Sequence, residues 1–169
     1  CSELTSVELS EGLEVIGEEA FDECTSLHAI FIPRSVKVIT MGAFYRCMKL
    51  MYVELSEGLE VIGEKAFREC RSLLAIVIPR SVNKIHACAF YGCWCLTHVE
   101  LPEGLEEIGE WAFYECKSLH AIVIPISVKE IPERAFYGCQ RLMSVELPKG
   151  LKEIGERAFY ECKSLHAIV

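Results

Sequence analysis

The sequence predicts an α/β repeat solenoid, in which one parallel sheet forms one face and short helical turns form the other. Two observations support this prediction: a cysteine recurs every 23 residues without an insertion, and every interval repeats the same pattern of apolar positions. A fixed period of roughly 20 to 50 residues is the signature of stacked repeat architectures. Residues 1–169 therefore form a single array of seven full repeats and part of an eighth.

Each repeat contains a strand pattern followed by a helical pattern. In the third unit Val53 and Leu55 alternate with Tyr52 and Glu54, which is the period of two that a half-buried strand requires. Within residues 62–70 the apolar side chains recur at the spacing of one helical face, which predicts a short helical turn. Neither element buries its apolar face within one unit, so the units must stack to share one continuous core.

Composition and charge make nucleic acids and membranes unexpected as partners. Of the residues, 51% are hydrophobic and 25% are charged, which is sufficient for a folded core. The net charge of -8 comes without any basic cluster, so neither nucleic acid nor an anionic membrane surface is an expected partner. No apolar run approaches the roughly 18 residues that a membrane span needs, so we expect no span in this chain.

The repeat motif resembles that of a known family. Residues 101–116 and 147–162 both read L-P-x-G-L-x-x-I-G-x-x-A-F-x-x-C, which is similar to the BspA-type leucine-rich repeat, and the match extends over the whole chain. The buried Asn of the commoner leucine-rich repeat is missing, and Gly or Ser occupies its neighbourhood. The resemblance implies a leucine-rich-repeat solenoid that is displayed at an extracellular or cell surface, adheres to host or matrix proteins and carries no catalytic residues.

The recurring cysteines are predicted to form a buried ladder of reduced thiols, not disulfides or a zinc site. Adjacent members lie about 5 Å apart with parallel Cα–Cβ bonds, whereas a disulfide needs converging Cβ atoms at about 3.8 Å. The thiols of Cys93 and Cys95 should point to different sides, which makes this C-x-C pair a weak metal motif. An exposed Cys95 would be the thiol sensitive to oxidation. The predicted ladder consists of Cys24, Cys47, Cys70, Cys93, Cys116, Cys139 and Cys162.

The histidines and carboxylates predict neither a catalytic nor a metal site. His28, His120 and His166 share a column, but the last two lie two repeats, or about 9.6 Å, apart, whereas each nitrogen on a zinc ion lies about 2.1 Å from it. The strand glutamates recur in equivalent surroundings, which predicts a solvated acidic stripe in place of a differentiated acid pair. Asp22 is the sole aspartate, and no nucleophile-elbow or phosphate-loop motif occurs. We therefore expect no enzyme activity, cofactor or metal.

A second period of 46 residues is superimposed on the first, because odd units read V-E-L and even units read I-F-I or I-V-I. The outward strand positions therefore alternate between acidic and apolar side chains. The strand-lined face of a solenoid is extended, which suits binding of another protein; the alternative is that its apolar members only supply β-propensity. The predicted partner-binding residues are Glu8, Phe31, Tyr52, Glu54, Val77, His98, Glu100, Val123 and Glu146.

Other columns support structural interpretations. Charges that alternate in sign beside the strand face predict ion pairs between neighbouring units, and tyrosines on the helical side favour an aromatic ladder over a binding stripe. The charged column is Glu11, Arg34, Glu57, Arg80 and Glu103, and the aromatic column is Tyr91, Tyr114, Tyr137 and Tyr160. If one local site exists, the irregular residues of the fourth and fifth units are its candidates: Leu74, Asn83, His86, Cys88, Trp94, Cys95 and His98.

Two functions from different classes follow. The first is a non-catalytic scaffold that mediates protein–protein interaction or adhesion through its strand-lined face. The alternative is a structural protein that assembles with further copies of itself, end to end, into filaments or surface layers. The pattern shows no capping unit at either end, so we expect a part of a longer array or a unit that stacks end to end.

Overall fold

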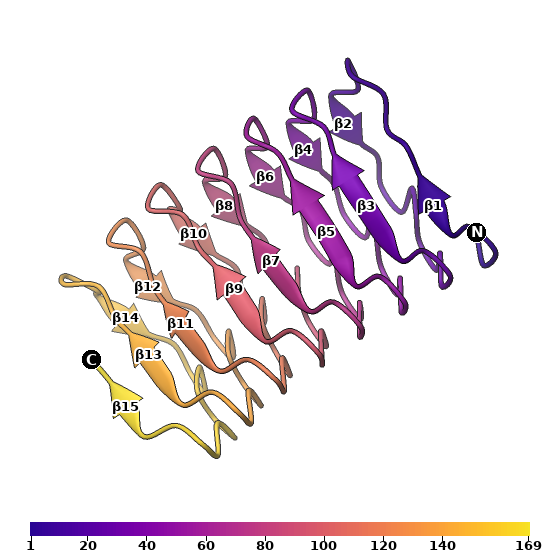
Figure 1. Ribbon diagram of the computed structural model, residues 1–169. Coiled ribbons are helices and arrows are strands. Elements are labelled where there is room, and N and C mark those ends of the chain that lie inside the picture. The colour runs from indigo at the N-terminus through magenta and orange to yellow at the C-terminus, as the bar shows by residue number, and fades with distance from the viewer.

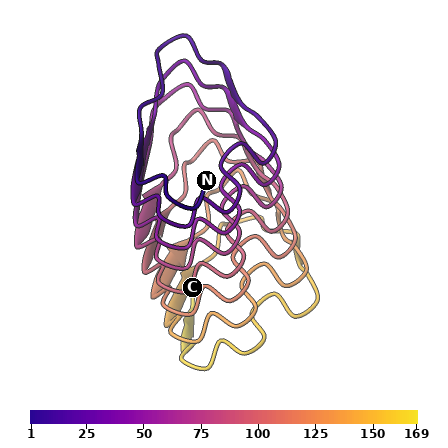
Figure 2. The same ribbon diagram turned by 90° about the vertical axis from the view of Figure 1, so that its right-hand side faces the viewer.

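Each 23-residue repeat forms one coil with two short strands, and corresponding strands of successive coils lie side by side (Figure 1). The computed structural model describes residues 1–169. The coils stack along one axis, so the two termini lie at opposite ends of the array (Figure 1). Figure 2, which views the array obliquely from its N-terminal end, shows that the coils follow similar paths, each displaced from the one before it. The 23-residue period of the sequence is therefore the period of the coils.

The odd-numbered strands form the predicted parallel sheet. It has five strands in the order β1-β3-β5-β7-β9 and continues as a three-stranded sheet, β11-β13-β15, along the same side of the array (Figure 1). Burial alternates along each strand, as in Ala29–Ile32, where Ile30 and Ile32 point into the core. The strands are β1 (Ser6–Val7), β3 (Ala29–Ile32), β5 (Tyr52–Leu55), β7 (Ala75–Val77), β9 (His98–Glu100), β11 (Ala121–Val123), β13 (Ser144–Glu146) and β15 (Ala167–Ile168).

The even-numbered strands form a second parallel side, so the prediction of one sheet is corrected to two. Five of them pair in the order β10-β8-β6-β4-β2, and β12 pairs with β14. Each strand has only two residues, which is too short to show a period of two in the sequence. The strands are β2 (Val15–Ile16), β4 (Val38–Ile39), β6 (Val61–Ile62), β8 (Lys84–Ile85), β10 (Glu107–Ile108), β12 (Glu130–Ile131) and β14 (Glu153–Ile154).

The predicted helical turns are wrong, because the third side of each coil contains turns and no helix. Lys65 and Glu69 have φ angles of 57° and 59°, which belong to the left-handed region. The equivalent residues of the other coils share this conformation, and some of them are glycines, such as Gly42 and Gly92. A left-handed residue at every fourth position interrupts an α-helix at each turn. Accordingly, no helix in the structure is long and apolar enough to cross a membrane.

The backbone of this turn side bonds to the next coil as a strand would. The N–H groups of the six turn-side phenylalanines donate to alanine carbonyls one coil further on, at 2.8–2.9 Å; these residues are Phe21, Phe44, Phe67, Phe90, Phe113 and Phe136. The amides of Lys65 and Glu69 donate to the following coil in the same way, at 3.0 and 2.7 Å. Hydrogen bonds between coils therefore replace the bonds within a helix, and the buried turn backbone stays paired.

The core is one continuous apolar column enclosed by the three sides of the coils. Forty-two buried residues belong to a single hydrophobic cluster, and no polar or charged residue is buried. Its centre is a stack of phenylalanine rings from Phe21 to Phe159, with centroids 5.1–5.5 Å apart and planes within 6° of parallel. Ring stacking adds to the apolar area that each coil buries against its neighbours.

Close approach of successive coils requires glycine at Gly63. A Cβ atom there would lie 2.6 Å from the carbonyl oxygen of Ile39 in the preceding coil. Gly17 occupies the same position in the first coil, where a Cβ atom would meet nothing within 4 Å. The two glycines therefore form a matched pair that separates backbone crowding from glycine flexibility.

We predict that Gly63→Ala destabilises the array by at least about 2 kcal/mol, because the added methyl group meets rigid backbone. Gly17→Ala should change stability by less than about 1 kcal/mol. Urea denaturation followed by circular dichroism measures both midpoints. Equal midpoints for the two variants would show that the coils do not pack as closely as described.

Candidate functional site

The outward side chains of the odd-numbered strands form the candidate site, which we call the strand face. All nine residues predicted to bind a partner are exposed there, including Tyr52 at 60% and Val77 at 55%. Strand register places an acidic side chain beside each apolar one. The register pairs are Phe31 with Glu54, Val77 with Glu100, and Val123 with Glu146. The acidic and apolar alternation along the sequence thus becomes an alternation between neighbouring strands.

A second outward column of the strand face alternates in size. Tyr52 pairs with Ala29 on one side and with Ala75 on the other, and Ala75 in turn pairs with His98. Ala121 follows on the next strand. Since alanine lacks side-chain atoms beyond Cβ, the even-numbered coils leave hollows between the larger side chains of their neighbours. The strand face therefore has a relief that repeats every two coils.

The largest apolar hollow lies where these columns meet on β3, β5 and β7. It is an open groove of about 430 Å³ that Phe31, Tyr52 and Leu74 line together with the two alanines beside Tyr52. Glu54 is the only charged residue that lines it. Smaller hollows of about 190 and 180 Å³ follow along the same face, over Ala75 and Ala121. The groove is suited to apolar side chains of a partner that lies across the strands.

The charge of the strand face has one sign. Its outward columns contain Glu8, Glu54, Glu100 and Glu146, all exposed, and no lysine or arginine. The strands belong to a chain whose net charge is -8. A negative potential over an apolar relief favours partners that carry positive charge.

Sequence reasoning missed Leu74 as a member of this face. Leu74 directly precedes β7, is 37% exposed and lines the groove beside Tyr52. It occupies the column of His28 and Met51, one position before the strand, and a comparison of that column across units could have found it. Ala29 and Ala75 were missed because small side chains give no signal of their own.

The irregular residues of the fourth and fifth units do not form one site. Leu74 and His98 lie on the strand face, and Asn83 precedes β8 in the second sheet. Trp94 lies on the turn side, with Arg71 and Lys117 at 4.1 and 4.4 Å from its rings. Lys117 comes from the coil after Trp94 and Arg71 from the coil before it, so this cluster joins three coils. Its cation–π contacts support stacking of the array.

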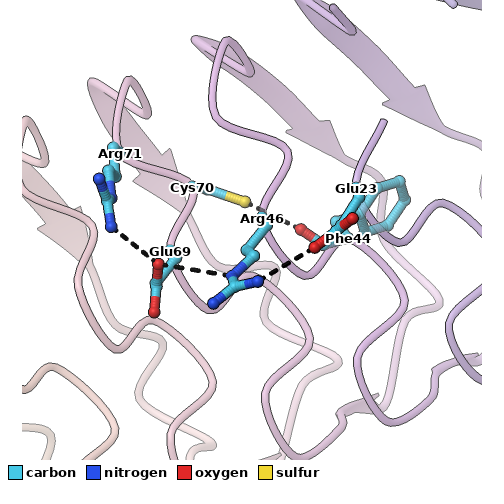
Figure 3. Close-up of polar contacts among 6 residues, drawn as sticks. All are labelled: Glu23, Phe44, Arg46, Glu69, Cys70 and Arg71. Atoms are coloured by element: carbon cyan, nitrogen blue, oxygen red, sulfur yellow. Dashed lines mark hydrogen bonds and ion pairs between the residues drawn. The ribbon is translucent and has the colours of Figure 1, made fainter. Parts of the chain in front are cut away.

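The turn side carries a charged network that also joins coils. Arg46 donates to Glu23 at 3.0 Å and lies 3.7 Å from Glu69, which also pairs with Arg71 at 2.9 Å (Figure 3). The hydrogen bond to Glu23 raises the pKa of Arg46. Each of these groups is partly exposed to solvent, so the ion pairs are screened and contribute little to stability.

Aromatic side chains continue this network. The rings of Tyr91, Tyr114, Tyr137 and Tyr160 stack at 4.6–5.2 Å. Arg68 replaces a tyrosine in the same column, with its guanidinium 5.9 Å from the ring of Tyr45 and 4.3 Å from that of Tyr91. The stacked faces of these rings are covered by neighbouring coils. The contacts stabilise the stacking of the coils, and the ring faces of Tyr114 and Tyr137 are covered on both sides, whereas Tyr160 in the last coil is 52% exposed.

The cysteines of the repeat column are free thiols packed behind the turn side. Cys24, Cys47, Cys70, Cys93, Cys116 and Cys139 are buried, and Cys162 is half-buried. The thiol of Cys70 donates to the carbonyl oxygen of Phe44 at 3.2 Å (Figure 3), and each thiol from Cys47 to Cys162 makes the equivalent bond at 3.1–3.3 Å. Burial raises the pKa of Cys47 from 9.0 to about 12 and that of Cys70 well above its usual value. The thiols of Cys47 and Cys70 therefore remain protonated at neutral pH.

The predicted ion pairs of the charged column beside the strand face do not form. Neither Arg34 nor Arg80 lies within 4.0 Å of a carboxylate there. The carboxylate of Glu57 instead accepts hydrogen bonds from the backbone N–H groups of Arg80 and Ser81, each at 3.2 Å. The acid is satisfied by the turn backbone of the next coil, which leaves the guanidinium group solvated. No group of three or more His, Cys, Asp or Glu side chains is arranged to hold a metal ion.

Comparison with known proteins gives one family and several similar structures. The chain matches the family described as BspA type leucine rich repeat region (6 copies), over residues 1–119 and 60–169. The leucine rich repeat protein of T. pallidum is 36% identical with a TM-score of 0.89, over 93% of this chain and 74% of that one. A leucine rich cell surface protein from Faecalibacterium prausnitzii A2-165 is 34% identical with a TM-score of 0.86, over 96% of this chain.

A leucine-rich repeat protein from Bacteroides ovatus ATCC 8483 is 28% identical with a TM-score of 0.55, over 99% of this chain. The chain spans 45% of the F. prausnitzii protein and 55% of the B. ovatus protein, which is less than two thirds of either. No curated protein matches the chain.

We predict that the array loses stability as pH rises from 9 toward 12, because the buried thiols hold their protons more tightly than unfolded thiols. The contribution of Cys47 is complete below its unfolded pKa of 9.0 and is lost as pH approaches its folded pKa of about 12. Cys47→Ala should flatten the decline by about 1.4 kcal/mol per pH unit. Urea midpoints across this range measure the slope.

Leu50→Val is the control, because it also removes buried apolar volume but titrates nothing. If the Cys47 thiol causes the decline, the slope of Leu50→Val equals that of the wild type. An unchanged slope in Cys47→Ala would show that the Cys47 thiol does not cause it.

Proposed function

The chain belongs to the BspA-type leucine-rich repeat family, and from that membership we propose that it is a non-catalytic scaffold that binds another protein through its strand face. The observation that carries this proposal is the apolar groove over β3, β5 and β7 beside the glutamate column. Exposed Phe31, Tyr52 and Leu74 line this groove, and exposed Val77 lines the adjoining hollow on β7. Apolar side chains gathered on an otherwise charged surface are typical of protein interaction sites.

The energetics of the strand face suit a protein partner. Covering an apolar side chain that is half exposed contributes on the order of 1 kcal/mol, and the groove gathers several of them. Side chains in sheets are held by neighbours on both sides, so little conformational freedom is lost when a partner binds. Because the strand face is extended, the contact is distributed over many coils, as is common in complexes of repeat proteins with their partners.

The same residues argue for binding in place of catalysis. The carboxylates of the strand face recur at equivalent positions on alternate strands and are all exposed. General acid and base catalysis needs carboxylates in contrasting environments. The strand face therefore supplies charge for recognition and no differentiated catalytic pair.

We further propose that the array acts at a cell surface. The F. prausnitzii protein, which is 34% identical, is described as a leucine rich cell surface protein. Adhesion to a protein outside the cell is the role that combines this location with an open binding face. Antibodies against the folded array, applied to intact and to permeabilised cells, test the location.

We predict that replacing Phe31 and Val77 together by glutamate weakens partner binding at least tenfold, because two buried charges would replace two apolar contacts. Random peptides displayed on phage and selected on the wild-type chain supply the probes. Val15→Glu with Val38→Glu is the matched control, because these side chains point outward from neighbouring strands of the second sheet, and Val15 is 48% exposed. Peptides that lose affinity for this control and keep it for the strand-face variant would contradict the proposal.

Molar mass by light scattering in reducing buffer accompanies this test. A constant monomeric mass across concentrations would support a role in which the strand face binds a partner. Mass that grows without a fixed stoichiometry would favour the alternative role, end-to-end structural assembly.

A further inference from the structure

The strand face repeats its chemistry at a fixed distance along the array. Equivalent side chains recur on every second strand, and neighbouring strands lie about 4.8 Å apart, so the repeat distance is about 9.6 Å. The acidic column Glu8, Glu54, Glu100 and Glu146 follows this distance, as do the hollows over Ala75 and Ala121. A partner that lies along the array gains a contact at each repeat only if its own period matches.

Polyproline II is the regular chain conformation whose period fits. It has three residues per turn and rises about 3.1 Å per residue, so side chains on one edge recur every 9.3 Å or so. An α-helix presents one face every seven residues, or about 10.5 Å. An extended strand presents one face every two residues, or about 6.7 Å. Over the three intervals from Glu8 to Glu146, polyproline II drifts by about 0.9 Å and an α-helix by about 2.7 Å.

The shape of the groove favours the same conformation. Polyproline II segments dock in shallow grooves between aromatic side chains, because their rings fill hollows that a flexible chain would fill at greater entropic cost. Phe31 and Tyr52 supply aromatic walls, and the alanine positions beside Tyr52 supply the space for proline rings. His98 stands between the later hollows, over Ala75 and Ala121, in the same column as Tyr52.

The acidic column indicates which side chain the partner carries at every third residue, that is, once per polyproline II turn. The glutamates recur at the same repeat as the hollows, and the outward columns contain no lysine or arginine to neutralise them. A basic side chain at every third residue of a polyproline II segment would meet one carboxylate per repeat. Such exposed pairs are screened by salt, so they fix the register of the partner and contribute most to affinity at low ionic strength, where the titrations are made.

We infer that the strand face binds a proline-rich segment in the polyproline II conformation, with a lysine or arginine at every third position, which lies along the array across the odd-numbered strands. This inference rests on the proposed function and names the class of partner. It assigns Phe31, Tyr52 and Leu74 to contacts with proline rings. Glu54 and Glu100 are assigned to the basic side chains.

The probe is a fluorescent peptide of five Pro-Pro-Lys triplets, and its control is a peptide of five Pro-Pro-Pro-Lys quadruplets. Both peptides carry the same charge and adopt polyproline II, but basic residues recur about 12.4 Å apart in the control. Fluorescence anisotropy titrations with the wild-type chain give both affinities. We expect the triplet peptide to bind at least tenfold more tightly than the quadruplet peptide.

Variants separate a registered contact from general attraction between opposite charges. Glu54→Gln with Glu100→Gln should weaken triplet binding at least tenfold. Glu130→Gln with Glu153→Gln removes the same charge from exposed positions of the second sheet and should leave binding unchanged. Melting curves of the two double variants check that each remains folded.

Three outcomes would overturn the inference: equal affinity for the two peptides, equal loss in the two double variants, or no binding of the triplet peptide. Phage selection on the strand face distinguishes these failures from failure of the proposed function. Selected peptides that depend on Phe31 and Val77 but contain no proline triplets would leave strand-face binding intact and reject this class of partner.

Discussion

Backbone hydrogen bonds between successive coils hold every other feature of the molecule in place. They run along the first sheet, the second sheet and the turn side, where the amides of six phenylalanines, such as Phe67, donate to the next coil. Because all three sides are joined at one spacing, each position of the repeat becomes a column of side chains along the array. The phenylalanine stack and the thiols are such columns in the core, and the strand face consists of two such columns at the surface.

The 23-residue repeat, the stacked array and the first sheet could be predicted from the sequence. The spacing of the apolar residues shows both the 23-residue repeat and the alternation with period two that is typical of a strand. The helical turn could not be distinguished from the true turn by apolar spacing, since both bring residues 62–70 to one side. What separates them is the left-handed backbone at Lys65 and Glu69. Gly42 and Gly92, in the equivalent positions of other coils, were the available signal.

The candidate site was predictable to the extent that it depends on strand alternation. Exposed positions such as Phe31 and Glu54 follow directly from the period of two, and the structure places them side by side. The hollow over Ala75 depends on what neighbouring coils put beside it, which a single repeat does not reveal. The predicted ion pairs of the charged column were wrong because the Glu57 carboxylate accepts hydrogen bonds from backbone N–H groups of the next coil and does not pair with the Arg80 guanidinium.

The most direct test of the account is to measure which carbonyl each amide of the turn side binds. Scalar couplings across hydrogen bonds, recorded by NMR on a protein labelled with ¹⁵N and ¹³C, identify the acceptor of each donor. The account predicts a coupling between the amide nitrogen of Phe67 and the carbonyl carbon of Ala89 in the next coil. A coupling from Phe67 to the carbonyl of Gly63 would instead show an α-helical turn and would contradict the stacking that aligns the strand face.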